Sequence, residues 1–315
     1  MNPPPFSTSS FTKTNVKIPS ARSEWNLDAW VYTPKVDGIT PPYPAVIMAN
    51  GFGLCKTHGL PAYAEAFASA GYASILFDYR RWGLSDGTRR NSIYVSEQLD
   101  DYRAVFEWVR KNPEFDKDRI VLWGFSFSGG HVLTLSAELG PQVRATISQS
   151  PHLGRSLPFY WTVNYFKFWF YGLLDLVKQV LGLSPVYIPI VGRPGTLAAV
   201  TRSHAFEGFL KLTGGSREIH IEAPLTLQVS ASTFFRVPSY KPIQNAHLIK
   251  CPVLFVAPKN DASRPASETI AVSAMVQSSS VLHLSGGHFD LFRGGVDYEQ
   301  SIHSQIEFLR KHVSF

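Results

Sequence analysis

Apolar and polar positions along the chain follow two alternating patterns. Three short runs are almost entirely apolar and predict buried strands: residues 44–48, 73–77 and 119–123. Residues 144–148 predict a further strand. Between them, apolar side chains recur every three or four positions, as in helices, over residues 60–70, 97–111 and 130–139. Residues 25–32 alternate apolar with polar side chains and predict a half-exposed strand. This alternation of strands and helices predicts an α/β fold, a mostly parallel twisted sheet with helices on both faces.

The alternation stops at Pro151 and resumes near residue 251. Residues 151–250 are rich in aromatic residues and proline and show no regular period. After them the pattern predicts strands at 252–257 and 280–284 and helices at 266–276 and 298–312. We therefore predict a flexible N-terminal segment (1–19), an α/β core (20–150 and 251–315) and an inserted lid (151–250). An insertion that follows the carboxyl end of a strand lies where parallel sheets bind their ligands.

Composition excludes several classes of protein. With 44% apolar and 17% charged residues in 315, the chain is not disordered. The net charge is +6, but lysine and arginine are scattered, so nucleic acid is not an expected partner. Cys55 and Cys251 have no disulfide-framework or metal-ligand spacing, which favours a reducing compartment. We recognise no secretory signal or membrane-spanning run and expect a cytoplasmic protein; its oligomeric state is left open.

The strongest local signal joins the strand at 119–123 to the helix at 130–139. Its sequence is Gly-Phe-Ser-Phe-Ser-Gly-Gly, residues 124–130. A serine on a sharp strand-to-helix turn needs small residues two positions away, because larger ones would collide with the backbone. Ser126 has Gly124 and Ser128 at those positions, and Ser128 has Ser126 and Gly130. We expect Ser126 to be the nucleophile, because it follows the strand end more closely, and keep Ser128 as the alternative.

A serine nucleophile needs a general base, and that base needs a group that orients it. On such a fold the chain order is serine, acid, histidine. Asp261 and His288 each follow a predicted strand by three or four residues, and two glycines precede the histidine. We predict His288 as general base and then acid, with Asp261 orienting its ring. Asp290 is the alternative acid, although it lies only two residues from His288.

Two backbone N–H groups are expected to bind the oxyanion that forms during attack on a carbonyl. One belongs to Phe127, next to the nucleophile. The other comes from the glycine-rich loop at residues 50–55, with Phe52 as the predicted donor and Gly53 as the alternative. The charged segment at residues 77–87 is predicted to be structural, with aspartate caps and arginine pairs.

Together these features resemble the α/β-hydrolase superfamily. The resemblance rests on the turn at 124–130, the Asn50-Gly51 loop, the Asp78-Tyr79-Arg80 segment, Asp261 and the Gly287-His288-Phe289-Asp290 string. Within the superfamily, residues 124–131 and 191–197 resemble the fungal polyketide transferase and hydrolase family. Ser128 departs from the usual second glycine of the turn, and Asn50 stands where many relatives have histidine.

This resemblance implies acyl chemistry without a cofactor or a metal ion. The implied substrate is a polyketide or polyketide–peptide ester or thioester of secondary metabolism, hydrolysed or transferred through an acyl-enzyme. An acyl carrier protein of a synthase is then a candidate partner. Two alternatives stay open: a detoxifying carboxylesterase or peptidase-like hydrolase, and a protein of the same fold that only binds a small molecule.

The predicted lid begins with an aromatic stretch. Nine of the thirteen residues from 159 to 171 are aromatic. We expect a helix whose apolar face contacts an apolar acyl substrate through Phe159, Trp161, Phe166, Trp169 and Phe170. Two other interpretations are an ordinary buried lid helix and peripheral contact with a membrane surface.

Overall fold

A computed structural model of the chain describes residues 10–154, 163–202, 204–213 and 227–315. Among these residues the main sheet has eight strands in the order β1-β2-β4-β3-β5-β6-β9-β10. The strands are β1 (Phe11–Pro19), β2 (Asn26–Pro34), β3 (Tyr43–Ala49), β4 (Ala73–Phe77), β5 (Phe115–Phe125), β6 (Ala145–Gln149), β9 (Val253–Pro258) and β10 (Ser279–Leu284). Strand β2 runs antiparallel to β1 and β4, and all other neighbours are parallel. The predicted mostly parallel α/β sheet is confirmed.

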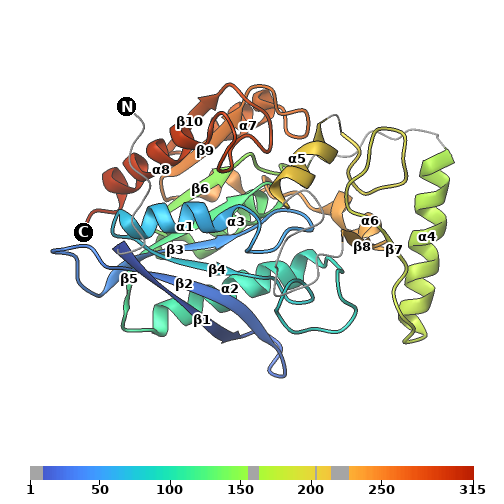
Figure 1. Cartoon of the computed structure of the whole chain (residues 1–315), viewed down its shortest axis with the longest axis horizontal. Helices are drawn as coiled ribbons and strands as arrows, with labels where there is room; N and C mark the ends of the chain where they lie inside the picture. The colour runs from blue at the N-terminus through green and yellow to red at the C-terminus, as the bar shows by residue number, and fades with distance from the viewer. Residues whose placement is uncertain (1–9, 155–162, 203, 214–226) are drawn as a thin grey trace.

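Helices cover the sheet in two groups (Figure 1). Helix α1 (Leu60–Ser69) packs beside α8 (Tyr298–His312), and the Tyr298 hydroxyl donates to the Ala62 carbonyl oxygen at 3.1 Å. Helix α2 (Val95–Lys111) lies beside α3 (Phe127–Leu139), where Arg103 pairs with Glu138. Helix α7 (Ala266–Ser273) packs on β9 and β10. The buried strands β3 and β4, enclosed between these helices, are the continuous apolar runs that the sequence pattern predicted.

The N-terminal prediction needs a correction. Residues 11–19 were predicted to be part of a flexible segment, but they form β1 and pair with β2 along its whole length. Four of its nine residues are β-branched, which suits a strand, and Ile18 is fully buried. The lysines and the asparagine between these residues make the segment look too polar for a strand. An edge strand carries such residues because much of its length is exposed. Residues 1–9 lie outside the described part of the chain.

The chain leaves the sheet after β6 and returns at β9, the immediate neighbour of β6. The described elements in between are α4 (Val163–Val180), β7 (Tyr187–Pro189), α5 (Ala205–Leu212), β8 (Gln228–Ser230) and α6 (Thr233–Arg236), followed by two short 3₁₀ turns at Val237–Ser239 and Ala246–Leu248. Strands β7 and β8 form a separate antiparallel pair. Figure 1 shows these elements gathered at one end of the molecule, with α4 outermost. The division into core and inserted lid stays a prediction.

Candidate active site

The turn between β5 and α3 holds Ser126 in an uncommon backbone conformation. Ser126 has φ 54° and ψ −109°, a positive φ that L-residues rarely adopt. The turn is too tight for larger neighbours, since a Cβ on Gly124 would lie 2.2 Å from the Ser128 carbonyl oxygen. A Cβ on Gly130 would lie 2.5 Å from the carbonyl oxygen of His152. The small residues in this motif are therefore required by the backbone that presents Ser126.

Ser126, His288 and Asp261 form one hydrogen-bonded chain. The Oγ of Ser126 lies 3.0 Å from Nε2 of His288, and Nδ1 of His288 lies 2.6 Å from Oδ2 of Asp261. Because a carboxylate can only accept, Nδ1 donates to Asp261, which leaves Nε2 free to accept the serine proton. The three residues follow β5, β10 and β9, whose carboxyl ends lie at the same edge of the sheet.

A fourth side chain, Ser150, joins this chain and was missed by the sequence reasoning. Its hydroxyl donates to Oδ2 of Asp261 and lies 2.9 Å from Nδ1 of His288. Ser150 directly follows β6 and has φ 46°. Its position after a strand end, where Asp261 and His288 also lie, was the signal that could have found it.

Asp261 is held as a carboxylate although it is buried. Burial alone would raise its pKa, but the His288 ring, the Ser150 hydroxyl and the backbone N–H of Arg264 outweigh burial and lower that pKa below its ordinary value. The N–H groups of Ser263 and Arg264 both donate to Oδ1, at 2.7 and 2.8 Å. Asp290, the alternative acid, accepts instead from the Gly287 N–H at 2.8 Å. The Asp261 carboxylate can therefore orient the His288 ring through the hydrogen bond to Nδ1.

The structure separates the two candidate serines. Ser128 is fully buried, and its hydroxyl donates to the carbonyl oxygen of Asn50. It also lies 2.6 Å from the hydroxyl of Tyr79, whose pKa burial raises well above its ordinary value. The Ser128 hydroxyl is thus hydrogen-bonded to the backbone of another loop, whereas the Ser126 hydroxyl lies within hydrogen-bonding distance of His288.

The loop predicted to complete an oxyanion hole lies against Ser126. A Cβ added to Gly51 would stand 3.0 Å from the Cβ of Ser126. The ring of Phe52 packs edge-on against that of Phe127, with centroids 5.9 Å apart. Gly53 has φ 71° and abuts Ile190 from the inserted segment. The Phe52 loop and Phe127 therefore lie together beside Ser126, and the oxyanion-binding role of their N–H groups stays a prediction.

This loop is anchored by a buried lysine. Lys56 is fully buried, and its Nζ lies 2.5 Å from Oδ1 of Asp28 and 2.6 Å from Oδ2 of Asp78. The backbone N–H of Lys56 also donates to Asp78, at 2.7 Å. Asn50 adds two hydrogen bonds from its Nδ2, to the carbonyl oxygens of Cys55 and His58, at 2.9 and 2.7 Å. The loop conformation is thus fixed by contacts within the core.

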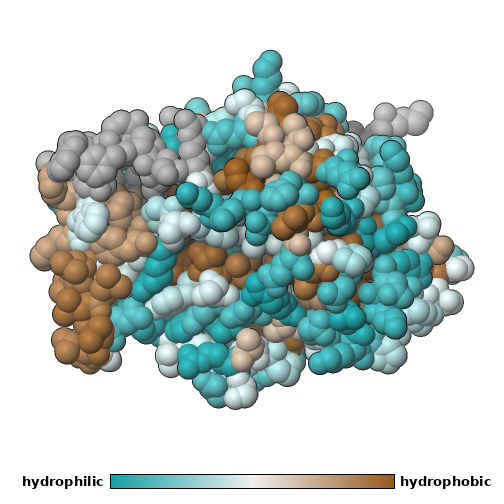
Figure 2. Space-filling model, turned by 180° about the vertical axis from the view of Figure 1, so that it is seen from behind, coloured by the Kyte–Doolittle hydropathy of each residue, from teal (hydrophilic) through white to brown (hydrophobic). Residues whose placement is uncertain are grey.

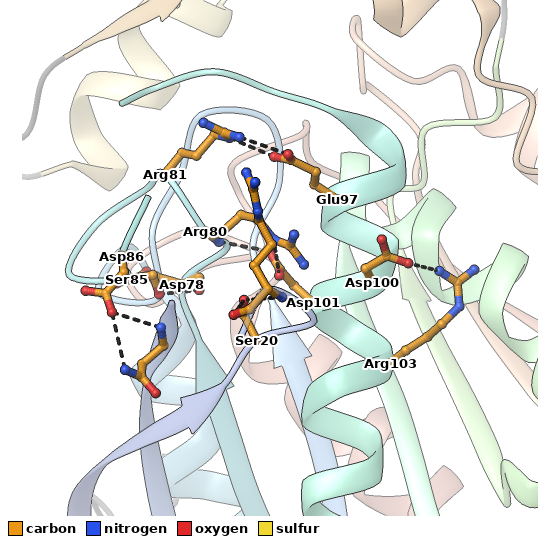
Figure 3. A network of polar contacts seen from close by, with 12 residues as sticks. Ser20, Asp78, Arg80, Arg81, Ser85, Asp86, Glu97, Asp100, Asp101 and Arg103 are labelled. Atoms are coloured by element: carbon orange, nitrogen blue, oxygen red, sulfur yellow. Dashed lines mark hydrogen bonds and ion pairs between the residues drawn. The ribbon is translucent and has the colours of Figure 1, made fainter. Parts of the chain in front are cut away.

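The charged segment at 77–87 shows the ion pairs of a structural element (Figure 3). Arg80 binds Asp101 on α2 with its Nε at 2.6 Å, and Arg81 binds Glu97 on the same helix at 2.7 Å. Asp78 takes part in the Lys56 contacts. The segment therefore ties α2 and the loop of Phe52 to the end of β4.

A small apolar cavity of about 60 Å³ lies beside Phe52. It is lined by Phe52, Ile188, Ala199, Val229, Ser230, Thr233, Phe234, Val237 and Pro238. Nearly all of its wall comes from the segment between β6 and β9, and one wall is the loop next to Ser126. A cavity of this size, well below that of a typical ligand pocket, holds only a small apolar group.

The aromatic residues predicted to contact the substrate are not among those that line this pocket. Phe166, Trp169 and Phe170 lie on α4 with 57%, 48% and 64% of their surface exposed. Phe159 and Trp161 lie outside the described residues. The amphipathic pattern predicted the helix but not which of its faces would point inward.

Comparison with known proteins places this chain in a family. Residues 25–172 match the family model of X-Pro dipeptidyl-peptidase (S15 family). A quorum-quenching protein, AidA of Acinetobacter baumannii, is 31% identical over 287 residues, 90% of this chain and 91% of that protein. Polyketide transferase af380 of Aspergillus fumigatus is 29% identical over 294 residues, 92% and 95% of the two chains.

A solved structure agrees with the fold. The α/β-hydrolase GrgF from Penicillium sp. sh18 superposes with a TM-score of 0.78 at 24% identity, over 96% of this chain and all of that one. The sheet order, the strand-to-helix turn at Ser126 and the sequence relatives are mutually consistent. The chain therefore belongs to the α/β-hydrolase superfamily, within the family of hydrolases and transferases that includes the polyketide transferases.

Proposed function

We propose that this protein is a serine-dependent acyl hydrolase or acyltransferase that acts on an apolar polyketide-type ester or thioester. The observation that carries the proposal is the chain of hydrogen bonds from Ser126 through His288 to Asp261. The names of several relatives, polyketide transferases among them, support the substrate class. The apolar pocket beside Phe52 supports a substrate with an apolar acyl group.

The proposed reaction begins when the Ser126 oxygen attacks the acyl carbon while His288 Nε2 takes its proton. Asp261 keeps the ring in the required tautomer and stabilises the imidazolium. The N–H groups of Phe52 and Phe127 bind the oxyanion, and each such donor contributes about 3 kcal/mol to the transition state. His288 then protonates the leaving alcohol or thiol, which leaves an acyl group on Ser126.

The second half of the reaction decides between hydrolysis and transfer. Water or an acceptor hydroxyl, amine or thiol attacks the acyl-enzyme, with His288 as base. An acceptor held next to the acyl group gains an effective concentration of about 10⁵ M or more, which is enough to outcompete water. An acyl carrier protein of a synthase is the proposed thioester donor.

Intact-protein mass spectrometry after mixing with a medium-chain acyl thioester tests the proposal. We expect an added acyl mass, or turnover of the thioester, in the wild-type protein and in Ser128→Ala. Neither should appear in Ser126→Ala. If Ser126→Ala still turns over the thioester, the proposed nucleophile is wrong. If none of the proteins reacts while the ligand still raises the melting temperature, the protein is a binder instead.

A second candidate function is hydrolysis of a small signalling molecule. The 31% identity with a quorum-quenching protein over 90% of the chain favours it. Both candidates use the same proposed nucleophile, so they differ in substrate only. A panel of long-chain thioesters and small apolar esters and lactones distinguishes them by kcat/KM.

A further inference from the structure

Helix α4 carries a long apolar face on the outside of the molecule. Its exposed apolar residues are Phe166, Trp169, Phe170, Leu173, Leu174, Val177 and Val180, and Leu181 and Leu183 continue this surface beyond the helix. In Figure 2 this surface is the brown column at the left edge, and in Figure 1 the helix stands at the outer end of the molecule. At about 1.5 Å per residue the helix makes a convex ridge roughly 27 Å long.

The opposite side of α4 is fixed to the protein, so the apolar face cannot simply turn inward. Asp175 is fully buried and accepts hydrogen bonds from the hydroxyls of Ser230 and Ser232. It also pairs with Arg89 at 2.8 Å. A Cβ added to Gly172 would lie 2.5 Å from the ring of Phe235, which shows how closely the helix is seated.

The net charge of the chain is concentrated in the same part of the sequence. Residues 151–250 hold ten lysines and arginines against four acidic residues, so this segment carries +6 and the other 215 residues carry none. On α4 itself the only acidic residue is the buried Asp175. Lys167 and Lys178 are eleven positions apart, so they project from the same edge of the helix, along the border of the apolar face.

We propose that the outer face of α4 docks on the surface of an anionic phospholipid bilayer. An apolar helix face with aromatic residues and lysines at its border is the pattern of a helix that lies in a membrane interface. The lysines at its border, Lys167 and Lys178, complement anionic headgroups. Among the described residues no helix is long and apolar enough to cross a bilayer, so the contact is peripheral.

Two other occupants fit this face less well. A two-fold dimer through α4 would bring Lys167 and Lys178 of both copies into one interface, where like charges repel each other. A protein partner would normally find hydrogen-bonding groups, roughly one for every 100–200 Å² of interface. Of the nine exposed apolar side chains only that of Trp169 carries such a group, and a bilayer interior requires none.

Co-sedimentation of the full chain with vesicles tests this inference. We expect binding to phosphatidylcholine mixed with phosphatidylserine, much weaker binding to phosphatidylcholine alone, and loss of binding as salt is raised. The double variant Leu173→Glu/Val177→Glu should weaken binding at least about tenfold, because each residue loses its apolar contact with the lipid. Lys167→Gln and Lys178→Gln should each weaken it about fivefold.

Val296→Glu is the matched control for Val180→Glu, because Val296 is 78% exposed, lies outside α4 and undergoes the same single substitution. It should bind like the wild type. Thermal melting verifies that each variant is folded, and Val180→Glu, at a position 87% exposed, replaces the double variant if that one unfolds. The inference is overturned if the wild type does not sediment with anionic vesicles or if the α4 variants sediment equally well. It is also overturned if those variants abolish self-association or binding to an acyl carrier protein and leave vesicle binding unchanged.

Discussion

The Ser128 hydroxyl donates a hydrogen bond to the carbonyl oxygen of Asn50, a residue 78 positions earlier in the chain. This contact joins the turn that carries Phe127 to the loop that carries Phe52, so it sets the distance between the two proposed oxyanion donors. A glycine at position 128 could not make it. The serine in this motif therefore acts on the neighbouring loop.

Ser128→Ala should lower kcat about tenfold with little change in KM, less than the loss of a whole oxyanion donor. The expected cause is a displaced Phe52 loop. Steady-state kinetics with a thioester that the wild-type protein turns over measures kcat and KM. Ser136→Ala is the control, because Ser136 is also buried on α3 but bonds to Val132 and Thr146 away from this loop. Equal losses in both variants would show a general effect on α3.

Ser150→Ala should lower kcat several-fold, because Asp261 loses one of the donors that hold its carboxylate. Since Ser150 acts through Asp261, the same substitution in an Asp261→Asn background should have much less effect. A double-mutant cycle on kcat measures this coupling. Additive effects would contradict a role for Ser150 in positioning Asp261.

Lys56→Met should destabilise the protein by about 3–5 kcal/mol, because it leaves the carboxylates of Asp28 and Asp78 buried without their cation. Lys17 also pairs with Asp28, but its side chain is half exposed, so Lys17→Met should cost less than about 1 kcal/mol. Urea unfolding measures both free energies. Similar values for the two variants would refute the structural importance of the buried lysine.

Acid should destabilise the fold through buried histidines. Burial lowers the pKa of His58 to about 4, and of His131 and His152 to about 3. Unfolded histidine titrates near pH 6.5, so below about that pH the unfolded chain binds more protons and stability falls as the pH falls. Each histidine contributes up to about 1.4 kcal/mol per pH unit in this range. Urea midpoints measured from pH 7.5 down to 5 should show the decline.

A single substitution measures how much one of these histidines contributes to the pH dependence of stability. His131 is fully buried between the Tyr240 hydroxyl and the Gln98 side chain, at 2.9 Å from each. His131→Gln should reduce the slope of stability against pH by close to one proton, whatever its effect at pH 7.5. His283→Gln, in the partly exposed strand β10, serves as control. An unchanged slope in His131→Gln would mean that His131 does not contribute to the loss of stability in acid.

Residue patterns predicted the core of this fold because a strand buried on both faces must be apolar along its length. The same logic placed Ser126, Asp261 and His288 after strand ends, where the structure brings them into hydrogen-bonding contact. Strand β1 was not predicted, because edge strands carry polar residues. The pocket was also not predicted, because its wall joins Phe52 to residues near 188, 229 and 237, and no local pattern records such distant contacts. Ser150 was not predicted, because a serine after a strand is usually a turn residue.

The adjacency of β6 and β9 has a consequence for how such a protein can evolve. The Ser150 N–H donates to the Val256 carbonyl oxygen at 2.9 Å, so the two strands that flank the intervening segment are hydrogen-bonded neighbours. The entropy of closing a loop grows only with the logarithm of its length, by about 0.6 kcal/mol for each doubling. Insertions and deletions between the end of β6 and the start of β9 therefore cost the sheet little. Ligand preference and surface attachment can diverge in this module while the strands that carry Ser126, Asp261 and His288 stay the same.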